Sequence, residues 1–272
     1  MAVKKSSTSG ENTARKNSKR STAGPVERGS PTSSGETPPQ IQTPLERDIL
    51  EHLGRYRVSV REVIARYFFA GEKGKASGAL GKLQRQGVIQ IRARDLDGGH
   101  SYYQLTQKGC AAAGVAKDRA APLSGLSLAR SLGVLWFATM NGKKRALLPN
   151  AKLPPSCPKL PGAALHVVEI LAKNDGRIYR VQVVAEDKDY HYPLAEIRKT
   201  LAALGATPEG AAFIESGAYA FAVLVHEEAK AIRFREAFSS LSEPLPHKAR
   251  VLVERVPSPS NFSLFVKPDA SL

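Results

Sequence analysis

The sequence predicts an α+β protein in which three short helices and a two-stranded hairpin precede a small α/β domain. Apolar residues recur at helical spacing from Thr43 to Gly87, and the pattern then changes to the alternation expected of strands. Beyond residue 125, runs rich in Val and Ile alternate with amphipathic stretches. This second pattern is typical of packed strands and helices with some parallel pairing.

We expect four segments along the 272 residues. Residues 1–40 consist largely of Ser, Thr, Gly, Pro, Lys and Arg, and they have almost nothing to bury, so a disordered basic tail is predicted. The helices and hairpin should occupy 43–117 and the α/β domain 125–258. The last residues, 259–272, are expected to form a C-terminal tail.

Capping residues define the first two helices. Thr43 can cap a helix that has Pro44 in its first position, and Gly54 is expected to end it. After a short extended piece, Ser59 can cap a second helix, which Gly71 should stop.

A third helix is predicted over 75–86, followed by strands at 88–94 and 101–105. Thr106 can cap a fourth helix. Three helices followed by a hairpin are the arrangement of a winged helix-turn-helix domain, which binds nucleic acid.

The second part is expected to begin with a helix and a strand and to continue with a hairpin. The turn of that hairpin, Asn174-Asp175-Gly176, lies between two runs rich in Val and Ile. The expected elements are a helix at 126–140, strands at 145–149, 164–173 and 177–185, a helix at 194–204, a strand at 219–225, a helix at 227–241 and a strand at 249–255.

The overall charge favours a polyanionic partner. The chain has 40 Lys and Arg against 25 Asp and Glu, a net charge of +15. We expect that partner to be double-stranded DNA, with RNA as an open alternative because the same surface would hold either polymer.

Other partners and cofactors find little support in the sequence. Cys110 and Cys157 lack neighbours at metal-ligand spacing, so no resident metal is expected. The sequence has neither of the common phosphate-binding glycine motifs, so no nucleotide cofactor is expected. The longest apolar run, 132–140, is far shorter than the roughly 20 residues of a membrane span. We expect a cytoplasmic protein with no membrane partner. The sequence is compatible with a homodimer.

In a helix-turn-helix the second helix of the motif enters the major groove, and here that is the helix at 75–86. Gly78 and Gly81 weaken it, and close approach to a DNA backbone and tight helix packing explain them equally well. Helical spacing predicts that Ala76, Ala79, Leu80 and Leu83 face inward and that the cations of this helix face outward. The candidate contacts are Lys73, Lys75, Ser77, Lys82 and Arg85 on or before this helix, and Arg92, Arg94 and His100 on the hairpin.

Seven short motifs point to a known family. They are Arg55-Tyr56-Arg57-Val58-Ser59, Arg66-Tyr67-Phe68-Phe69, Leu80-x-x-Leu83-x-x-x-Gly87, Leu105-Thr106-x-Lys108-Gly109, Val183-Val184-Ala185-Glu186-Asp187-Lys188, Pro193-Leu194 and Ala222-Val223-Leu224-Val225. In these motifs the chain from about 45 to 241 resembles the plasmid replication-relaxation family. The resemblance implies a winged helix joined to a restriction-endonuclease-like domain, and a regulator of transcription or plasmid replication.

The implied nuclease superfamily needs an Asp early in one strand and a Glu-x-Lys in the next, which together hold a divalent cation. Glu186 and Lys188 match the second part, but Gly162 stands where the Asp is expected. Asp175 and Glu169 are the possible substitutes, one at a hairpin tip and the other in mid-strand.

One carboxylate and one lysine do not make a metal site, so we expect a catalytically degenerate domain that serves in dimerisation or partner binding. The alternative is a magnesium-dependent DNA nuclease that uses Glu186 and Lys188.

Overall fold

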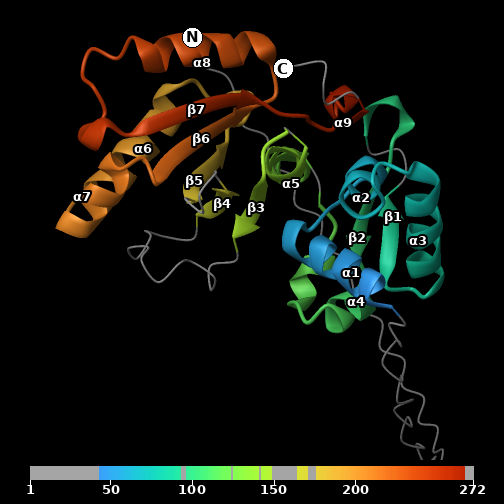
Figure 1. Ribbon diagram of the computed structural model, residues 1–272. Helices are drawn as coiled ribbons and strands as arrows, with labels where there is room; N and C mark the ends of the chain where they lie inside the picture. Colours follow the sequence, from blue (N-terminus) through green and yellow to red (C-terminus); the bar gives the residue numbers. More distant parts are fainter. Residues whose placement is uncertain are drawn as a thin grey trace, which may run out of the picture. The chain divides into compact units, whose positions relative to one another are not determined.

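The computed structural model describes residues 43–92, 96–123, 125–140, 142–148, 164–170 and 176–266. Within these ranges the fold is α+β: N-terminal helices with a two-stranded hairpin come first, and a five-stranded mixed sheet with flanking helices follows (Figure 1). The predicted tail at 1–40 and the turn at Asn174-Asp175 lie outside the described residues.

The N-terminal helices and the hairpin follow the predicted order. Antiparallel pairing aligns Ile89 with Leu105 and Arg92 with Tyr102. The elements are α1 (Pro44–Tyr56), α2 (Arg61–Phe68), α3 (Lys73–Arg85), β1 (Ile89–Arg92), the 3₁₀ turn η1 (Asp97–Gly99), β2 (Tyr102–Leu105), α4 (Gln107–Ala112) and the 3₁₀ turn η2 (Lys117–Ala120).

Two predicted caps are confirmed, whereas the predicted end of α1 is wrong. The Thr43 hydroxyl accepts the Glu46 amide at 3.3 Å, and the Thr106 hydroxyl accepts the Gly109 amide at 3.0 Å. Helix α1 continues past Gly54 to Tyr56, and Arg57, whose φ of 68° is left-handed, caps its end. Gly54 is small for packing, since an added Cβ would lie 3.0 Å from Val115.

The prediction that Ser59 caps α2 is wrong, because Val60 occupies the N-cap position. Ser59 instead forms a β-bridge with Tyr103, with backbone N–O distances of 3.0 and 2.8 Å. Its hydroxyl lies 3.0 Å from Nε2 of the buried His52. The bridge adds a short third strand segment to the hairpin.

The sheet has the order β3-β4-β5-β6-β7. The first three strands pair antiparallel and the last three parallel, which confirms the expected parallel pairing. The strands are β3 (Arg145–Leu148), β4 (Leu165–Ile170), β5 (Gly176–Val183), β6 (Tyr219–Val225) and β7 (Arg250–Arg255).

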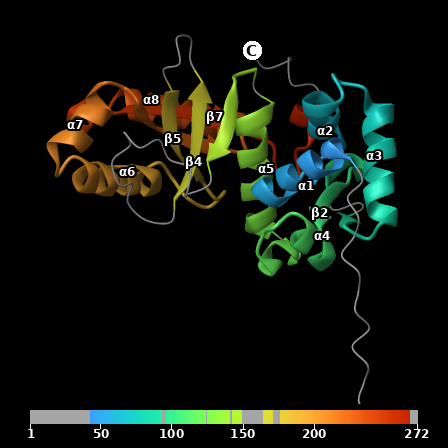
Figure 2. The same ribbon diagram turned by 60° about the horizontal axis from the view of Figure 1, so that its bottom comes forward.

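Helices cover both faces of this sheet (Figure 2). On one face α6 (His191–Leu204), α7 (Pro208–Glu215) and α8 (Glu228–Ser239) bury side chains such as Ile197 and Phe234 against β6. On the other face α5 (Gly125–Thr139) packs on Val181 and Ala222. Helix α7 was not predicted, although Thr207 caps it and Pro208 begins it.

Helix α5 is buried on nearly every side. Its face away from the sheet packs with Tyr56, Val63 and Tyr102, so one apolar core contains residues of the N-terminal helices, α5 and the sheet. The Tyr56 hydroxyl also accepts the Leu147 amide of β3 at 3.3 Å. The buried residues of α5 are Leu128, Ala129, Leu132, Gly133, Val134, Leu135, Trp136, Phe137 and Ala138.

The residues after β7 differ from the expected tail. A bridge joins Ser258 to Asn261, and α9 (Ser263–Val266) follows. Phe262 and Phe265 are each only 1% exposed and belong to the same core as α5. Across the described part of the chain, we find no helix with the length and apolar character that crossing a bilayer requires.

Two buried histidines predict how stability depends on pH. Burial, and secondarily Arg55, lowers the pKa of His52 to about 3, while burial and Arg180 lower that of His166 to about 4. Both have ordinary pKa values of 6.5, so below that pH the unfolded chain takes up protons that the folded chain does not. The free energy of unfolding should therefore be highest above pH 6.5 and should fall by a few kcal/mol towards pH 4. Each histidine can contribute up to about 1.4 kcal/mol for each unit by which its pKa is lowered.

Melting temperatures measured by circular dichroism between pH 7.5 and 4 test this expectation. The variant His166→Gln should flatten the dependence, whereas substitution of the exposed His191 by Gln should leave it unchanged. A melting temperature that stays constant from pH 7 to 4.5 would contradict it.

Candidate nucleic-acid interface

The periodicity of α3 separates a buried face from an exposed one. Of the four residues predicted to face inward, Ala76, Leu80 and Leu83 are buried against α1 and α2, and Ala79 is half-buried against the same core. Lys75 and Ser77 are exposed on the first two turns of the helix. The predicted outward face therefore forms. Lys73 begins the helix, Arg85 is its last residue, and both are exposed.

Two of the predicted cations on α3 have acidic partners. Nζ of Lys75 lies 2.8 Å from Oε1 of Glu72, and both side chains are more than half exposed. Such a surface pair contributes at most about 1 kcal/mol, so Lys75 can exchange its partner for a phosphate. Nζ of Lys82 lies 2.7 Å from Oε1 of Glu46, whose side chain is only 6% exposed. Lys82 therefore joins α3 to α1.

The glycines of α3 face open space. An added Cβ at Gly74 or Gly78 would meet nothing within 4 Å, and one at Gly81 would meet only Nη1 of Arg85, at 3.6 Å. By contrast, a Cβ at Gly109 of α4 would lie 1.8 Å from the Val88 carbonyl oxygen. Packing inside the protein therefore does not explain Gly74 or Gly78, at least among the described residues.

The predicted hairpin contacts are less freely presented. Arg92 is half-buried, and its Nε has no hydrogen-bond partner within the described ranges. His100 packs its ring on Phe262, with the ring centroids 4.5 Å apart. Arg94 lies outside the described residues. Hairpin and helix adjoin, because β1 contacts α3.

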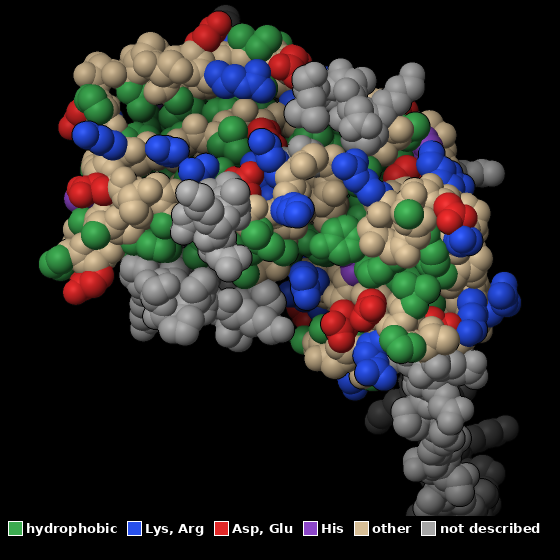
Figure 3. Space-filling view, viewed as in Figure 1, with side chains coloured by type: hydrophobic (Ala, Val, Ile, Leu, Met, Phe, Trp, Pro, Cys, Tyr) green, Lys and Arg blue, Asp and Glu red, His purple; other side chains and the backbone are tan. Residues whose placement is uncertain are grey.

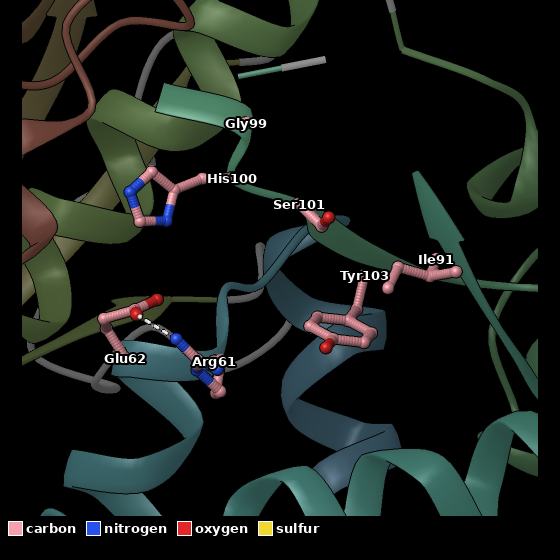
Figure 4. Close-up of a pocket in the computed structure, with 7 residues that line it drawn as sticks. All are labelled: Arg61, Glu62, Ile91, Gly99, His100, Ser101 and Tyr103. Carbon is pink, nitrogen blue, oxygen red and sulfur yellow. Dashed lines mark hydrogen bonds and ion pairs between the residues drawn. The ribbon is translucent and has the colours of Figure 1, made fainter. Parts of the chain in front are cut away.

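A cavity of about 270 Å³ opens between the start of α2 and the hairpin (Figure 4). Arg61, which the sequence analysis did not single out, lies at its rim and bonds Glu62 at 3.3 Å. The sequence signal that could have identified Arg61 is that it is a basic residue at the start of the second helix. The other residues that line the cavity are Ile91, Gly99, His100, Ser101 and Tyr103.

Basic side chains do not gather into one large patch on the face seen in Figure 3; acidic side chains lie between them. The distribution of charge over that face therefore does not identify one binding site. What distinguishes α3 is that its cations flank exposed backbone.

The residues of the nuclease alternative lie between β5 and α6. Glu186 and Lys188 are both exposed, and Nζ of Lys188 is 2.9 Å from Oδ2 of Asp187. This contact raises the pKa of Lys188 and lowers that of Asp187. The lysine that holds the segment is Lys230, which donates to the carbonyl oxygens of Ala185 and Glu186 at 2.9 Å each.

Glu169 takes part in a different set of contacts. It is buried in β4, where it lies 3.5 Å from Nη2 of Arg145 and accepts the Tyr179 hydroxyl at 2.7 Å. Asp175 and Gly162 lie outside the described residues. Over the ranges that the structure describes, no three His, Cys, Asp or Glu side chains come close enough together to hold a metal ion.

Comparisons of the chain with protein-family models, curated proteins and solved structures gave no match. What the chain does is therefore inferred from its own residues.

Proposed function

We propose that this protein binds double-stranded DNA through a winged helix-turn-helix formed by α1 to β2, and that it regulates transcription or plasmid replication. The observation that carries the proposal is the exposed face of α3, where Gly74 and Gly78 leave the helix backbone open between Lys73, Lys75 and Ser77. A groove-binding helix of this kind can approach DNA closely while its cations contact phosphates.

The order of the elements supports the winged-helix assignment. A winged helix has a short strand between its first two helices, and that strand pairs with the hairpin. Ser59 lies between α1 and α2 and bridges Tyr103 of β2. The connection from α2 to α3 is short, since it includes only 69–72. Both features fit a helix-turn-helix with a wing.

The energetic cost of the open glycines also supports an external binding surface on α3. Each glycine within a helix costs about 1 kcal/mol relative to alanine. Among the described residues, Gly74 and Gly78 gain nothing from packing to offset this cost, so an external surface that needs the space is the explanation we favour. A phosphate backbone that approaches α3 is such a surface.

Duplex DNA suits α3 better than duplex RNA. The major groove of B-form DNA is wide enough for a helix, whereas that of A-form RNA is too narrow and deep for its side chains to read. Of the cations on α3, Arg85 is the one with a guanidinium group for paired hydrogen bonds to guanine, and it stands at the end of the helix. We therefore expect modest sequence specificity.

The sheet region is proposed to serve in dimerisation or partner binding, as a restriction-endonuclease-like domain without cleavage. Both edge strands form a hydrogen bond with a side chain: the Leu147 amide of β3 donates to the Tyr56 hydroxyl, and Arg235 donates to the Val253 carbonyl of β7. These bonds oppose simple strand addition, so a dimer would use helix faces. Magnesium-dependent cleavage that is lost in Glu186→Ala would overturn the non-enzymatic part of the proposal.

Removal of two exposed cations of α3 should weaken DNA binding. The double variant Lys75→Ala and Arg85→Ala is expected to lower duplex affinity at least several-fold, because phosphate contacts are lost. Each lost contact should also reduce the slope of log affinity against log salt by about one unit. Fluorescence anisotropy over a salt series measures both effects.

The matched control removes the same charge from α6, where Arg198 and Lys199 are also exposed. Replacing both with Ala should change affinity little. An equal loss in the two double variants would mean that only net charge matters. Unchanged affinity in a folded Lys75/Arg85 variant would contradict the assignment of α3.

Gly78→Ala should have opposite effects on stability and on binding. The alanine gains about 1 kcal/mol of helix stability and its Cβ meets no neighbour within 4 Å in the described part of the chain, so the melting temperature should rise. If DNA approaches this face closely, affinity should fall at the same time. Calorimetry and anisotropy on one sample measure the two quantities.

Leu126, exposed on α5, offers a comparison site outside the proposed interface. Its replacement by Ala should leave duplex affinity unchanged. A Gly78→Ala protein that is more stable and binds DNA as tightly as the parent would show that the open face of α3 does not meet DNA.

A further inference from the structure

The chain returns to the hairpin after the last strand of the sheet. Val256 is fixed to the end of β6, because its amide donates to the Val225 carbonyl at 2.8 Å. The segment then makes the turn between Ser258 and Asn261 and enters α9. We name residues 256–265 the C-terminal strap.

The strap meets the hairpin loop at two places. The amide of Asp97 donates to the Pro259 carbonyl at 2.7 Å, a short backbone hydrogen bond. The ring of Phe262 packs on the ring of His100 at 4.5 Å, with an interplanar angle of 35°. Leu96, at the start of the loop, is 3% exposed and lies in the core that contains Phe262 and Phe265.

These contacts restrain a type of segment that is ordinarily mobile. Hairpin tips lie at the surface and usually have few buried contacts. Here two glycines with positive φ, Gly98 and Gly99, give the loop extra conformational freedom to lose. Residues 96–100, which these contacts anchor, have lost that freedom before any ligand binds.

We propose that the C-terminal strap holds the hairpin in its DNA-binding position and thereby couples the sheet region to DNA affinity. This inference rests on the proposed function. An ordered hairpin loses less conformational entropy on binding, so affinity is higher than for a free hairpin. By linkage, a duplex that engages the hairpin stabilises the strap contacts to the same degree.

In this arrangement His100 has a role other than direct phosphate contact. Its ring is the surface on which Phe262 packs, and it also lines the cavity beside Arg61 and Glu62. His100 is therefore a positioning residue for the hairpin. Its loss should resemble the loss of Phe262 and should not resemble the loss of a phosphate contact.

Hydrogen exchange of the full chain without DNA tests whether the C-terminal strap holds the hairpin loop. Phe262→Ala should speed exchange of the Asp97 amide about tenfold more than that of the α6 amides, which report only the loss of global stability. Phe234→Ala is the matched control, since it removes another buried ring, from the core on the opposite face of the sheet. Phe262→Leu keeps apolar bulk if the alanine variant does not fold. Exchange at Asp97 as slow as in the parent, in whichever variant folds, would overturn the strap.

Duplex binding over a salt series tests the coupling. Phe262→Ala and His100→Ala should each weaken binding several-fold without changing the salt slope, and the double variant should be no weaker than either. A slope reduced by about one unit in His100→Ala would make His100 a phosphate contact and overturn its positioning role. Unchanged affinity in a Phe262 variant with a loosened loop would overturn the coupling. A parent protein that does not bind duplex DNA would refute the proposed function and the coupling, whereas the exchange result would still decide whether the strap holds the loop.

Discussion

The structure depends on the burial of α5. This helix has almost no polar face, and side chains such as Leu132, Leu135 and Phe137 need apolar surroundings on several sides. The sheet covers one side, and the α1–α2 region with Tyr102 covers another. Each large apolar side chain that is fully buried stabilises the fold by about 1.5–3 kcal/mol, so neither neighbour can leave α5 without a large loss.

The same constraint explains a buried group of charges beside α5. The guanidinium of Arg145 lies 4.0 Å from the centroid of the Phe137 ring, and it also pairs with Glu169 and Glu254 at 3.5 and 3.4 Å. Removing one member of such a group leaves charge in a poorly solvated place, which is strongly destabilising. Glu169, considered from the sequence as a nuclease ligand, therefore has a structural role at the join between α5 and the sheet.

Local pattern predicted most of the elements, and tertiary contacts account for the differences. The run Tyr219–Val225 is uniformly buried, and its strand was predicted residue for residue. Gly54 resembles a helix terminator in sequence, but it is needed for contact with Val115. The meeting of Phe262 with His100 joins distant parts of the chain, which no local periodicity reveals.

The candidate interface divides in the same way. Helical spacing was enough to predict which side of α3 faces outward. It could not show that Lys82 pairs with Glu46 of α1, because that pair depends on how two helices pack. Nor could it decide whether Gly78 serves packing or an external surface, since the answer lies in the space around the helix.

We infer that α5 makes the N-terminal helices and the sheet one cooperative unit. Trp136, the one tryptophan of the chain, lies in α5 and is 7% exposed, so its fluorescence reports on this shared core. Equilibrium unfolding in urea tests this inference, because Trp136 fluorescence follows the shared core and far-ultraviolet circular dichroism follows the secondary structure. Coincident single transitions are expected. Two separate transitions, with helical signal lost while Trp136 stays native-like, would contradict it.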